Sequence, residues 1–215
     1  MTDKDKNLQI MLESGVTAVL RAKDSAQLMK VSEALAEGGV KSIEVTMTTP
    51  NALAVISEVS KKMGKEILVG VGTVLDPETA RAAILAGAQF VVGPTLNFDV
   101  IALCKRYGKV VVPGTFTPTE MLAAWEAGAD LCKLFPATAL GPQYIKDVHG
   151  PLPQIEIIPT GGVTYENTPD FIKAGAAAVA AGSAMVPKAD LESENFGAIR
   201  DMGAKFVAAV KQARA

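Results

Sequence analysis

Short, β-branched apolar runs recur along the chain at regular intervals. There are eight of them, at Val16–Leu20, Ser42–Thr46, Ile67–Val69, Phe90–Val92, Val110–Val112, Leu131–Leu134, Ile155–Ile158 and Ala178–Ala181. Runs of this kind, bounded by glycine, proline and polar residues, predict buried strands. Successive runs lie about 20 to 25 residues apart, which is the unit size of a compact βα repeat.

Amphipathic stretches with helical spacing fill the intervals between these runs. They lie at Ser25–Glu37, Thr49–Lys62, Pro77–Ala86, Phe98–Tyr107 and Pro118–Ala127. Several helical stretches end in a similar phrase before the next strand, at Glu37–Val40, Leu85–Ala88, Glu126–Ala129 and Lys173–Ala176. The glycines in these phrases suit the left-handed conformation that closes a helix. Strand and helix therefore alternate along the entire chain.

Eight such units predict an α/β fold, a (β/α)8 TIM barrel, with residues 1–215 forming a single domain. An open doubly wound sheet of the flavodoxin type is the alternative, because strand continuity does not separate the two. A chain of 215 residues suits one core of either kind. In both architectures chemistry gathers at the carboxyl ends of the parallel strands, and candidate residues are sought there.

Composition narrows the class of protein further. Apolar residues make up 49% and charged residues 20%, and no linker divides the chain, which favours a compact globular protein. The net charge of −2 and the few aromatic residues argue against a nucleic-acid partner. The apolar stretches are too short for a membrane span, and the charged N-terminus does not resemble a secretory signal. We therefore expect a cytoplasmic protein, in which Cys104 and Cys132 form no disulfide.

Polar and glycine residues cluster where the predicted strands end. They are Arg21, Glu44, Thr46–Thr48, Gly72-Thr73, Gly93-Pro94, Pro113–Thr115, Lys133, Pro159–Gly162 and Gly182-Ser183. In a barrel, all of these would face a single pocket.

Lys133 and Glu44 are the most informative of these residues. Lys133 lies in an apolar strand, where a lysine either reaches a cavity or loses its charge; burial favours the neutral, nucleophilic amine. A lysine that extends to the rim is the alternative. Glu44 also lies in an apolar strand, where an isolated carboxylate is unfavourable without a partner or a task. A buried Lys–Glu ion pair without catalytic role is the corresponding alternative.

Three further features suggest an anionic ligand. Arg21 adds positive charge near Lys133, unless it forms a salt bridge at the rim. Thr73 offers a hydroxyl and backbone donors to a carboxylate. The turns at Gly161-Gly162 and Gly182-Ser183 follow the seventh and eighth strands, where barrels commonly bind phosphate through backbone N–H groups. The alternative is that these glycines only permit tight turns.

The sequence gives little support to a metal or nucleotide site. His149 is the only histidine, and it is expected in a surface loop at the amino-terminal face of the barrel. No Cys or acidic cluster shows metal-ligand spacing, and neither a GxGxxG nor a Walker A pattern occurs. Catalysis by a covalent amine needs no metal.

The chain resembles the 2-keto-3-deoxy-6-phosphogluconate (KDPG) / 4-hydroxy-2-oxoglutarate (KHG) aldolases, class I enzymes, nearly from end to end. The matching segments are Ala18–Arg21, Glu37–Gly39, Ile43–Thr46, Gly72–Val74, Phe116–Glu120, Lys133–Ala137, Pro159–Val163 and Gly182-Ser183. The Lys-x-Phe-Pro-Ala segment at Lys133–Ala137 is the most specific of them. The resemblance also implies a TIM barrel, homotrimeric assembly and no cofactor.

The resemblance assigns roles to individual residues. It implies that Lys133 forms the Schiff base, Glu44 is the general acid/base, and Thr73 belongs to the pyruvate-carboxylate site. Thr160 would contribute to substrate preference, and the phosphate would be bound by Gly161, Gly162, Gly182 and Ser183. Arg21, Thr48, Pro94 and Phe135 are expected to complete the substrate site. Many members carry arginine where this chain has Thr48, and Arg21 is our candidate for the missing charge.

The implied reaction is reversible cleavage of KDPG to pyruvate and glyceraldehyde 3-phosphate, and of KHG to pyruvate and glyoxylate. The galactonate epimer of KDPG (KDPGal) is an alternative substrate. A metal-independent phosphosugar isomerase or epimerase and a non-catalytic phosphosugar-binding protein are alternatives of a different class. In each case the partner is a small phosphorylated or keto-acid molecule.

Overall fold

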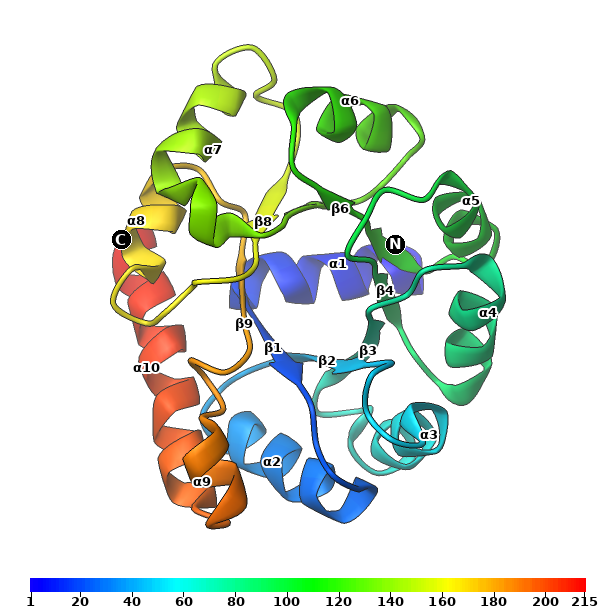
Figure 1. The fold of residues 1–215 in the computed structure, drawn as a ribbon, viewed down its shortest axis with the longest axis vertical. Coiled ribbons are helices and arrows are strands. Elements are labelled where there is room, and N and C mark those ends of the chain that lie inside the picture. Colours follow the sequence, from blue (N-terminus) through cyan, green and yellow to red (C-terminus); the bar gives the residue numbers. More distant parts are fainter.

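The strands form a ring that is surrounded by helices, as a computed structural model of residues 1–215 shows (Figure 1). Six parallel strands follow the order β5-β4-β3-β2-β1-β9, and three more follow the order β6-β7-β8. Their bounds are β1 (Val16–Leu20), β2 (Ser42–Thr46), β3 (Leu68–Gly72), β4 (Phe90–Val92), β5 (Val110–Val112), β6 (Gly114–Thr115), β7 (Cys132–Leu134), β8 (Ile157–Pro159) and β9 (Val179–Ala181). All eight predicted strands are present, with some ends shifted.

Two connections close the ring into a (β/α)8 barrel. β5 and β6 are one barrel strand interrupted at Pro113, which has no N–H to donate to a neighbouring strand. At the other junction, a parallel bridge between Thr160 and Ala180 joins the end of β8 to β9. The predicted barrel is thus confirmed, and the open doubly wound sheet is wrong for this chain.

The helices pack around the outside of the ring. They are α1 (Asp3–Ser14), α2 (Ser25–Glu37), α3 (Ala52–Met63), α4 (Pro77–Ala86), α5 (Phe98–Arg106), α6 (Pro118–Glu126), α7 (Gly141–His149), α8 (Thr168–Lys173), α9 (Lys188–Glu192) and α10 (Phe196–Arg214). The predictions for α2 to α6 are confirmed within a few residues. The left-handed glycines are confirmed too, since Gly39, Gly87, Gly128 and Gly175 all have positive φ. None of the helices has the length and apolar character required to cross a membrane.

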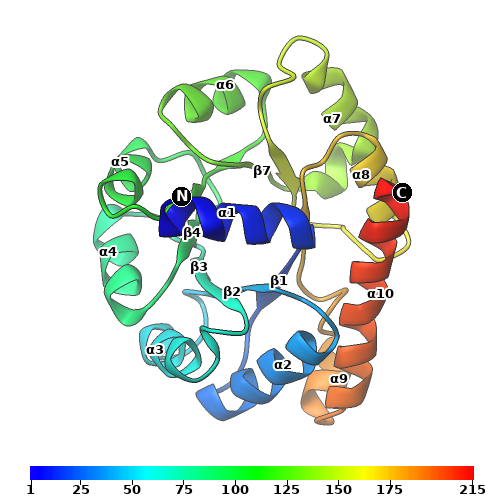
Figure 2. The same ribbon diagram turned by 180° about the vertical axis from the view of Figure 1, so that it is seen from behind.

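The hydrophobic core has two parts. The larger part lies between the strands and the outer helices, and the smaller one fills the barrel interior with residues such as Phe90, Val110 and Ile158. α1 crosses the amino-terminal end of the barrel (Figure 2), and its only buried residue, Met11, belongs to this inner cluster. Apolar packing therefore closes this end, and the opposite, carboxyl-terminal end is where a ligand can enter.

The prediction that His149 lies in a surface loop is wrong, although it does lie before the start of β8, toward the amino-terminal face. His149 is the last residue of α7 and is half-buried, with its Nε2 atom 2.9 Å from the carbonyl oxygen of Ile155. The surface-loop prediction overlooked that Ile145 and Val148 recur at helical spacing and are buried. Cys104 and Cys132 are buried and free.

Candidate active site

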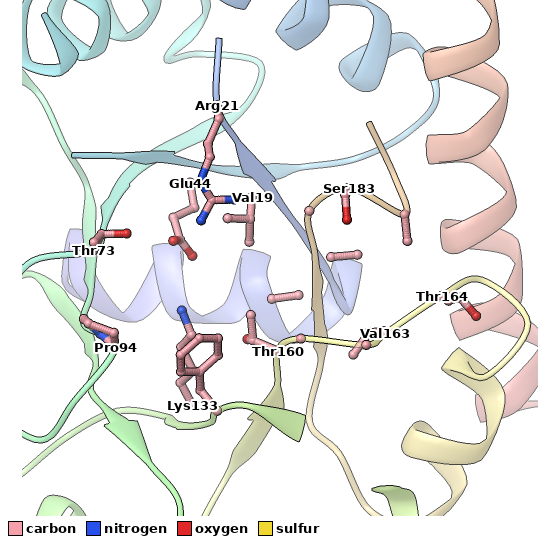
Figure 3. A pocket seen from close by; sticks show the side chains of 17 residues that line it. Val19, Arg21, Glu44, Thr73, Pro94, Lys133, Thr160, Val163, Thr164 and Ser183 are labelled. Atoms are coloured by element: carbon pink, nitrogen blue, oxygen red, sulfur yellow. The ribbon is translucent and has the colours of Figure 1, made fainter. Parts of the chain in front are cut away.

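A cavity of about 420 Å³ opens at the carboxyl-terminal end of the barrel (Figure 3). Eleven of the twelve predicted site residues line it: Arg21, Glu44, Thr73, Pro94, Lys133, Phe135, Thr160, Gly161, Gly162, Gly182 and Ser183. Six residues that were not predicted also line it: Val19, Val163, Thr164, Ala180, Ala181 and Ala184. Val163 and Ala184 directly follow the two predicted glycine turns, and that adjacency was the signal available for them.

Thr48 is the one predicted residue that the structure does not bring to the cavity. It is exposed in the turn after β2, and its hydroxyl forms a 2.8 Å hydrogen bond with the hydroxyl of Thr46. Thr48 does not contribute to the cavity wall, whereas Arg21 does. Arg21 therefore has a position from which it can take the role considered for position 48.

Lys133 lies in the middle of β7 and extends into the barrel. Its neighbours across the sheet are Gly114 and Ile158, and only 6% of its surface is exposed. The Nζ atom lies 5.0 Å from the centre of the Phe135 ring and takes part in no salt bridge. Figure 3 shows the amine pointing toward the carboxylate of Glu44. The lysine thus reaches a cavity and does not extend to the rim.

Glu44 faces Lys133 from the opposite wall. It is 2% exposed and forms no salt bridge within 4.0 Å, so a direct Lys–Glu ion pair is absent. Burial raises the pKa of the Glu44 carboxyl, and the charges of Lys133 and Arg21 partly oppose this shift. A raised pKa favours the protonated carboxyl more than in an exposed glutamate, which suits a group that both donates and accepts a proton in general acid/base catalysis.

Gly72, at the end of β3, leaves the space that the Glu44 carboxyl occupies. A β-carbon at this position would overlap Oε1 of Glu44. We expect Gly72→Ala to displace the carboxyl of Glu44, the predicted general acid/base, and to lower kcat by about 10²-fold, since a misplacement of about 1 Å at a reacting site has an effect of this size. Steady-state kinetics would measure this loss. Gly197→Ala, whose added carbon meets only Oδ1 of Asn195 at an ordinary contact distance of 3.9 Å, is the control. Equal kcat values in both variants would contradict the expectation.

Arg21 and Thr73 supply groups that suit a carboxylate. Arg21 forms no salt bridge, so the rim ion pair considered for it is absent. Thr73 has a φ of 60°, a left-handed conformation that is uncommon for threonine and often marks functional sites. Figure 3 places Thr73 and Pro94 on one side of Lys133 and Ser183 on the other.

The glycine turns form a wall of free backbone donors. Gly161 and Gly162 have φ values of 91° and 72°, and the amides of Gly161, Gly162, Ser183 and Ala184 donate no hydrogen bond within the protein. Free N–H groups on turns of this kind bind anions. Arg21 reaches this side of the cavity, because its Nη1 atom would lie 4.0 Å from a β-carbon added at Gly182. An anion here would therefore be bound by backbone amides, hydroxyls and this guanidinium.

Thr160 lies between the two ends of the cavity. Its hydroxyl oxygen is buried and has no hydrogen-bond partner in the protein. Such an atom is unfavourable unless a ligand supplies a partner. The hydroxyl is thus available to a polar group in the middle of a bound molecule.

The arrangement differs from a metal centre. No group of three or more His, Cys, Asp or Glu side chains is placed to hold a metal ion. Together the fold and the cavity define a (β/α)8 barrel with a buried lysine, a buried carboxyl and a wall of free backbone amides.

Comparison with known proteins gives a concordant result. A family model described as KDPG and KHG aldolase matches residues 8–202. The chain is 37% identical to the 2-dehydro-3-deoxy-6-phosphogalactonate aldolase of Escherichia coli (strain K12), over 77% of its own length and 82% of the relative's. It is 32% identical to the 2-dehydro-3-deoxy-phosphogluconate aldolase of Pseudomonas aeruginosa, over 87% of its own length and 85% of the relative's.

Solved structures agree. One described as native KDPGal has a TM-score of 0.87 at 33% identity and covers 93% of this chain and 95% of its own. The KDPG aldolase from Legionella pneumophila, with pyruvate captured as a covalent carbinolamine intermediate, has a TM-score of 0.85 at 26% identity and covers 92% and 96%. The chain belongs to the KDPG and KHG aldolase family, and it is therefore an aldolase of the lyase class.

Proposed function

We propose that this chain is a class I aldolase that cleaves KDPG to pyruvate and glyceraldehyde 3-phosphate through a Schiff base on Lys133. The observation that carries the proposal is the buried amine of Lys133 facing the buried carboxyl of Glu44 across one cavity. The carbinolamine of the Legionella relative supports covalent chemistry of this kind. Assembly as a homotrimer in the cytoplasm, without a cofactor, is part of the same proposal.

The first half of the reaction forms the Schiff base. The neutral amine of Lys133 attacks the C2 ketone and gives a carbinolamine. Loss of the hydroxyl group as water then gives an iminium, and a protonated Glu44 is positioned to supply the proton for this step. Arg21 and Thr73 bind the carboxylate next to C2, which holds the ketone against the amine.

The second half breaks the carbon–carbon bond. Glu44, now ionised, takes the proton of the C4 hydroxyl, the C3–C4 bond breaks, and its electron pair moves to the iminium to form an enamine. Glyceraldehyde 3-phosphate leaves. Protonation of the enamine at C3 and hydrolysis of the iminium then release pyruvate and restore the amine. A water molecule can relay the proton between Glu44 and the substrate.

The free amides at Gly161, Gly162, Ser183 and Ala184 support a phosphorylated substrate. KDPGal is the second candidate, because the 37% identical relative is named as an aldolase for it. The hydroxyl of Thr160 is the group in the middle of the cavity that could distinguish the two epimers. Turnover of KDPG, KDPGal and KHG, compared as kcat/KM for pyruvate release, tests the proposal; no release from any of them would refute it.

Arg21 provides the positive charge of the carboxylate site in this proposal. We expect Arg21→Gln to raise KM for the keto acid by about 10- to 100-fold, because a hydrogen bond to a charged group contributes about 1.5 to 3 kcal/mol. Thr48→Ala is the control, since this side chain lies outside the cavity and is expected to leave KM unchanged. Initial-rate kinetics would measure both. A large rise of KM in Thr48→Ala, with little change in Arg21→Gln, would contradict the assignment of the carboxylate contact to Arg21.

A further inference from the structure

Asn167 contacts the turn at Gly162 and Thr164, which forms part of the wall of free backbone amides, from outside the cavity. It precedes α8 and does not line the cavity. Its side-chain Nδ2 donates a 2.9 Å hydrogen bond to the carbonyl oxygen of Gly162, and its Oδ1 accepts a 2.8 Å hydrogen bond from the backbone N–H of Thr164. Its own backbone N–H donates to the hydroxyl of Thr164 at 3.3 Å. One residue therefore connects both ends of the turn that extends the glycine pair.

This turn needs an external restraint. Gly161 and Gly162 have no β-carbon, and glycine populates many backbone conformations at similar free energy. A β-carbon at Gly162 would come within 2.7 Å of the hydroxyl oxygen of Thr138, so the chain passes close to Thr138 only because this residue is glycine. The close approach requires glycine, and glycine alone does not select a single conformation. The hydrogen bonds of Asn167 to Gly162 and Thr164 select the conformation that the turn adopts.

The hydrogen bond from Asn167 to the carbonyl oxygen of Gly162 also fixes the direction of the backbone N–H of Val163. A trans peptide is planar, and its C=O and N–H groups point in opposite directions. Because Asn167 binds the carbonyl oxygen of Gly162, the N–H of Val163 in the same peptide plane is directed away from Asn167. Val163 lines the cavity, and its N–H donates no hydrogen bond within the protein. The side chain of Asn167 thereby orients a free amide for an anion.

We propose that Asn167 is a positioning residue that sets the affinity of the cavity for the phosphate end of its substrate without touching that substrate. This inference rests on the function proposed above. In the free protein Asn167 holds the amides of the turn in their binding arrangement, so that binding of a phosphate monoester does not have to order the glycines. The pyruvyl end, with Lys133 and Glu44, lies on other strands and does not depend on this contact.

Asn167→Asp is the sharpest variant. Aspartate keeps the size of the side chain and the acceptor for Thr164, but it loses the donor to Gly162 and places a carboxylate against that carbonyl. We expect KM for KDPG, or for KDPGal if that is the better substrate, to rise about tenfold or more, and inhibition by inorganic phosphate to weaken in parallel. The rate at which borohydride traps unphosphorylated pyruvate on the protein is expected to equal that of the wild type. Asn167→Ala, which adds no charge, is expected to change the same quantities in the same direction.

Asn97→Asp is the matched control. Asn97 makes the same types of contact, since its Nδ2 donates to the carbonyl oxygen of Leu75 and its Oδ1 accepts from the backbone amides of Asp99 and Val100. Asn97→Asp is expected to leave KM for the phosphorylated substrate, inhibition by inorganic phosphate and the rate of pyruvate trapping unchanged relative to one another. Unaltered KM and phosphate inhibition in both Asn167 variants, or a parallel loss of pyruvate trapping in both, would overturn the proposal for Asn167. Failure of the wild type itself to trap pyruvate would instead refute the proposed function.

Discussion

Replacing Lys133 by methionine is expected to lower kcat for aldol cleavage by more than about 10³-fold, because the variant has no amine to form an iminium. Methionine has a similar length and suits the apolar surroundings of β7, so the barrel is expected to fold. Release of pyruvate, followed with a coupled dehydrogenase, would measure the loss. Lys188→Met, at an exposed lysine, is the control.

A second variant separates covalent from electrostatic roles of the same residue. Lys133→Arg keeps the positive charge but cannot form a Schiff base with a ketone. The proposed mechanism predicts that it is as inactive as Lys133→Met. Substantial release of pyruvate by Lys133→Arg would show that the site needs only the positive charge and no Schiff base. A charge without a Schiff base is the role that the isomerase or epimerase alternative gives to Lys133.

Replacing Glu44 by glutamine is expected to lower kcat by about 10²- to 10⁴-fold, the usual contribution of a general acid/base. Because burial raises the pKa of the Glu44 carboxyl, the wild-type enzyme is expected to lose activity as pH falls through a pKa above the ordinary value for glutamate. The variant is expected to lack this acidic limb. A pH profile of kcat/KM for both proteins would measure the difference.

The same substitution is expected to stabilise the protein at neutral pH. The folded-state pKa of Glu44 lies above its unfolded value, so the folded form binds the proton more tightly. The associated stability is fully present below the unfolded pKa and is lost as pH rises through the folded pKa. Glu44→Gln is therefore expected to have a higher Tm than the wild type at neutral pH, with a difference that shrinks toward acidic pH.

Glu120→Gln is the control, because the pKa of Glu120 is shifted in the opposite direction to that of Glu44. Hydrogen bonds from the backbone amides of Phe116 and Thr117 lower the pKa of the Glu120 carboxyl. Its contribution to stability is present above the unfolded pKa and is lost as pH falls, so this variant is expected to have a lower Tm at neutral pH. A Glu44→Gln variant that is less stable than the wild type at neutral pH would contradict the view that burial dominates at this carboxyl.

The elements around the site could be predicted because their sequences carry strong periodic signals. The predicted apolar runs contain only three charged residues, Glu44, Lys133 and Glu156, so each was conspicuous. In the structure Glu44 and Lys133 are buried within strands, whereas Glu156 precedes β8 and is exposed. Parallel strands bring their carboxyl ends to one edge, and this rule was enough to place residues from seven different strands in one cavity. Strand pattern thus predicted both the fold and the centre of the site.

Features governed by tertiary contacts were beyond the sequence pattern. Thr48 follows a strand, but the turn after β2 directs it to solvent and its hydroxyl to Thr46. α1 buries only Met11, so its amphipathic signal is weak although it closes one end of the barrel. Asn167 is a polar residue in a loop, and its contacts with the glycine turn depend on the folded path of the chain.

The most direct test of the central claim is to incubate the wild-type protein with pyruvate and sodium borohydride and to determine the masses of the intact chain and of its peptides. Only an iminium is reduced to a stable adduct. The proposed mechanism predicts one reduced pyruvyl group on the peptide that contains Lys133 and none in Lys133→Met. An unmodified wild-type chain, or an adduct on another lysine, would contradict it.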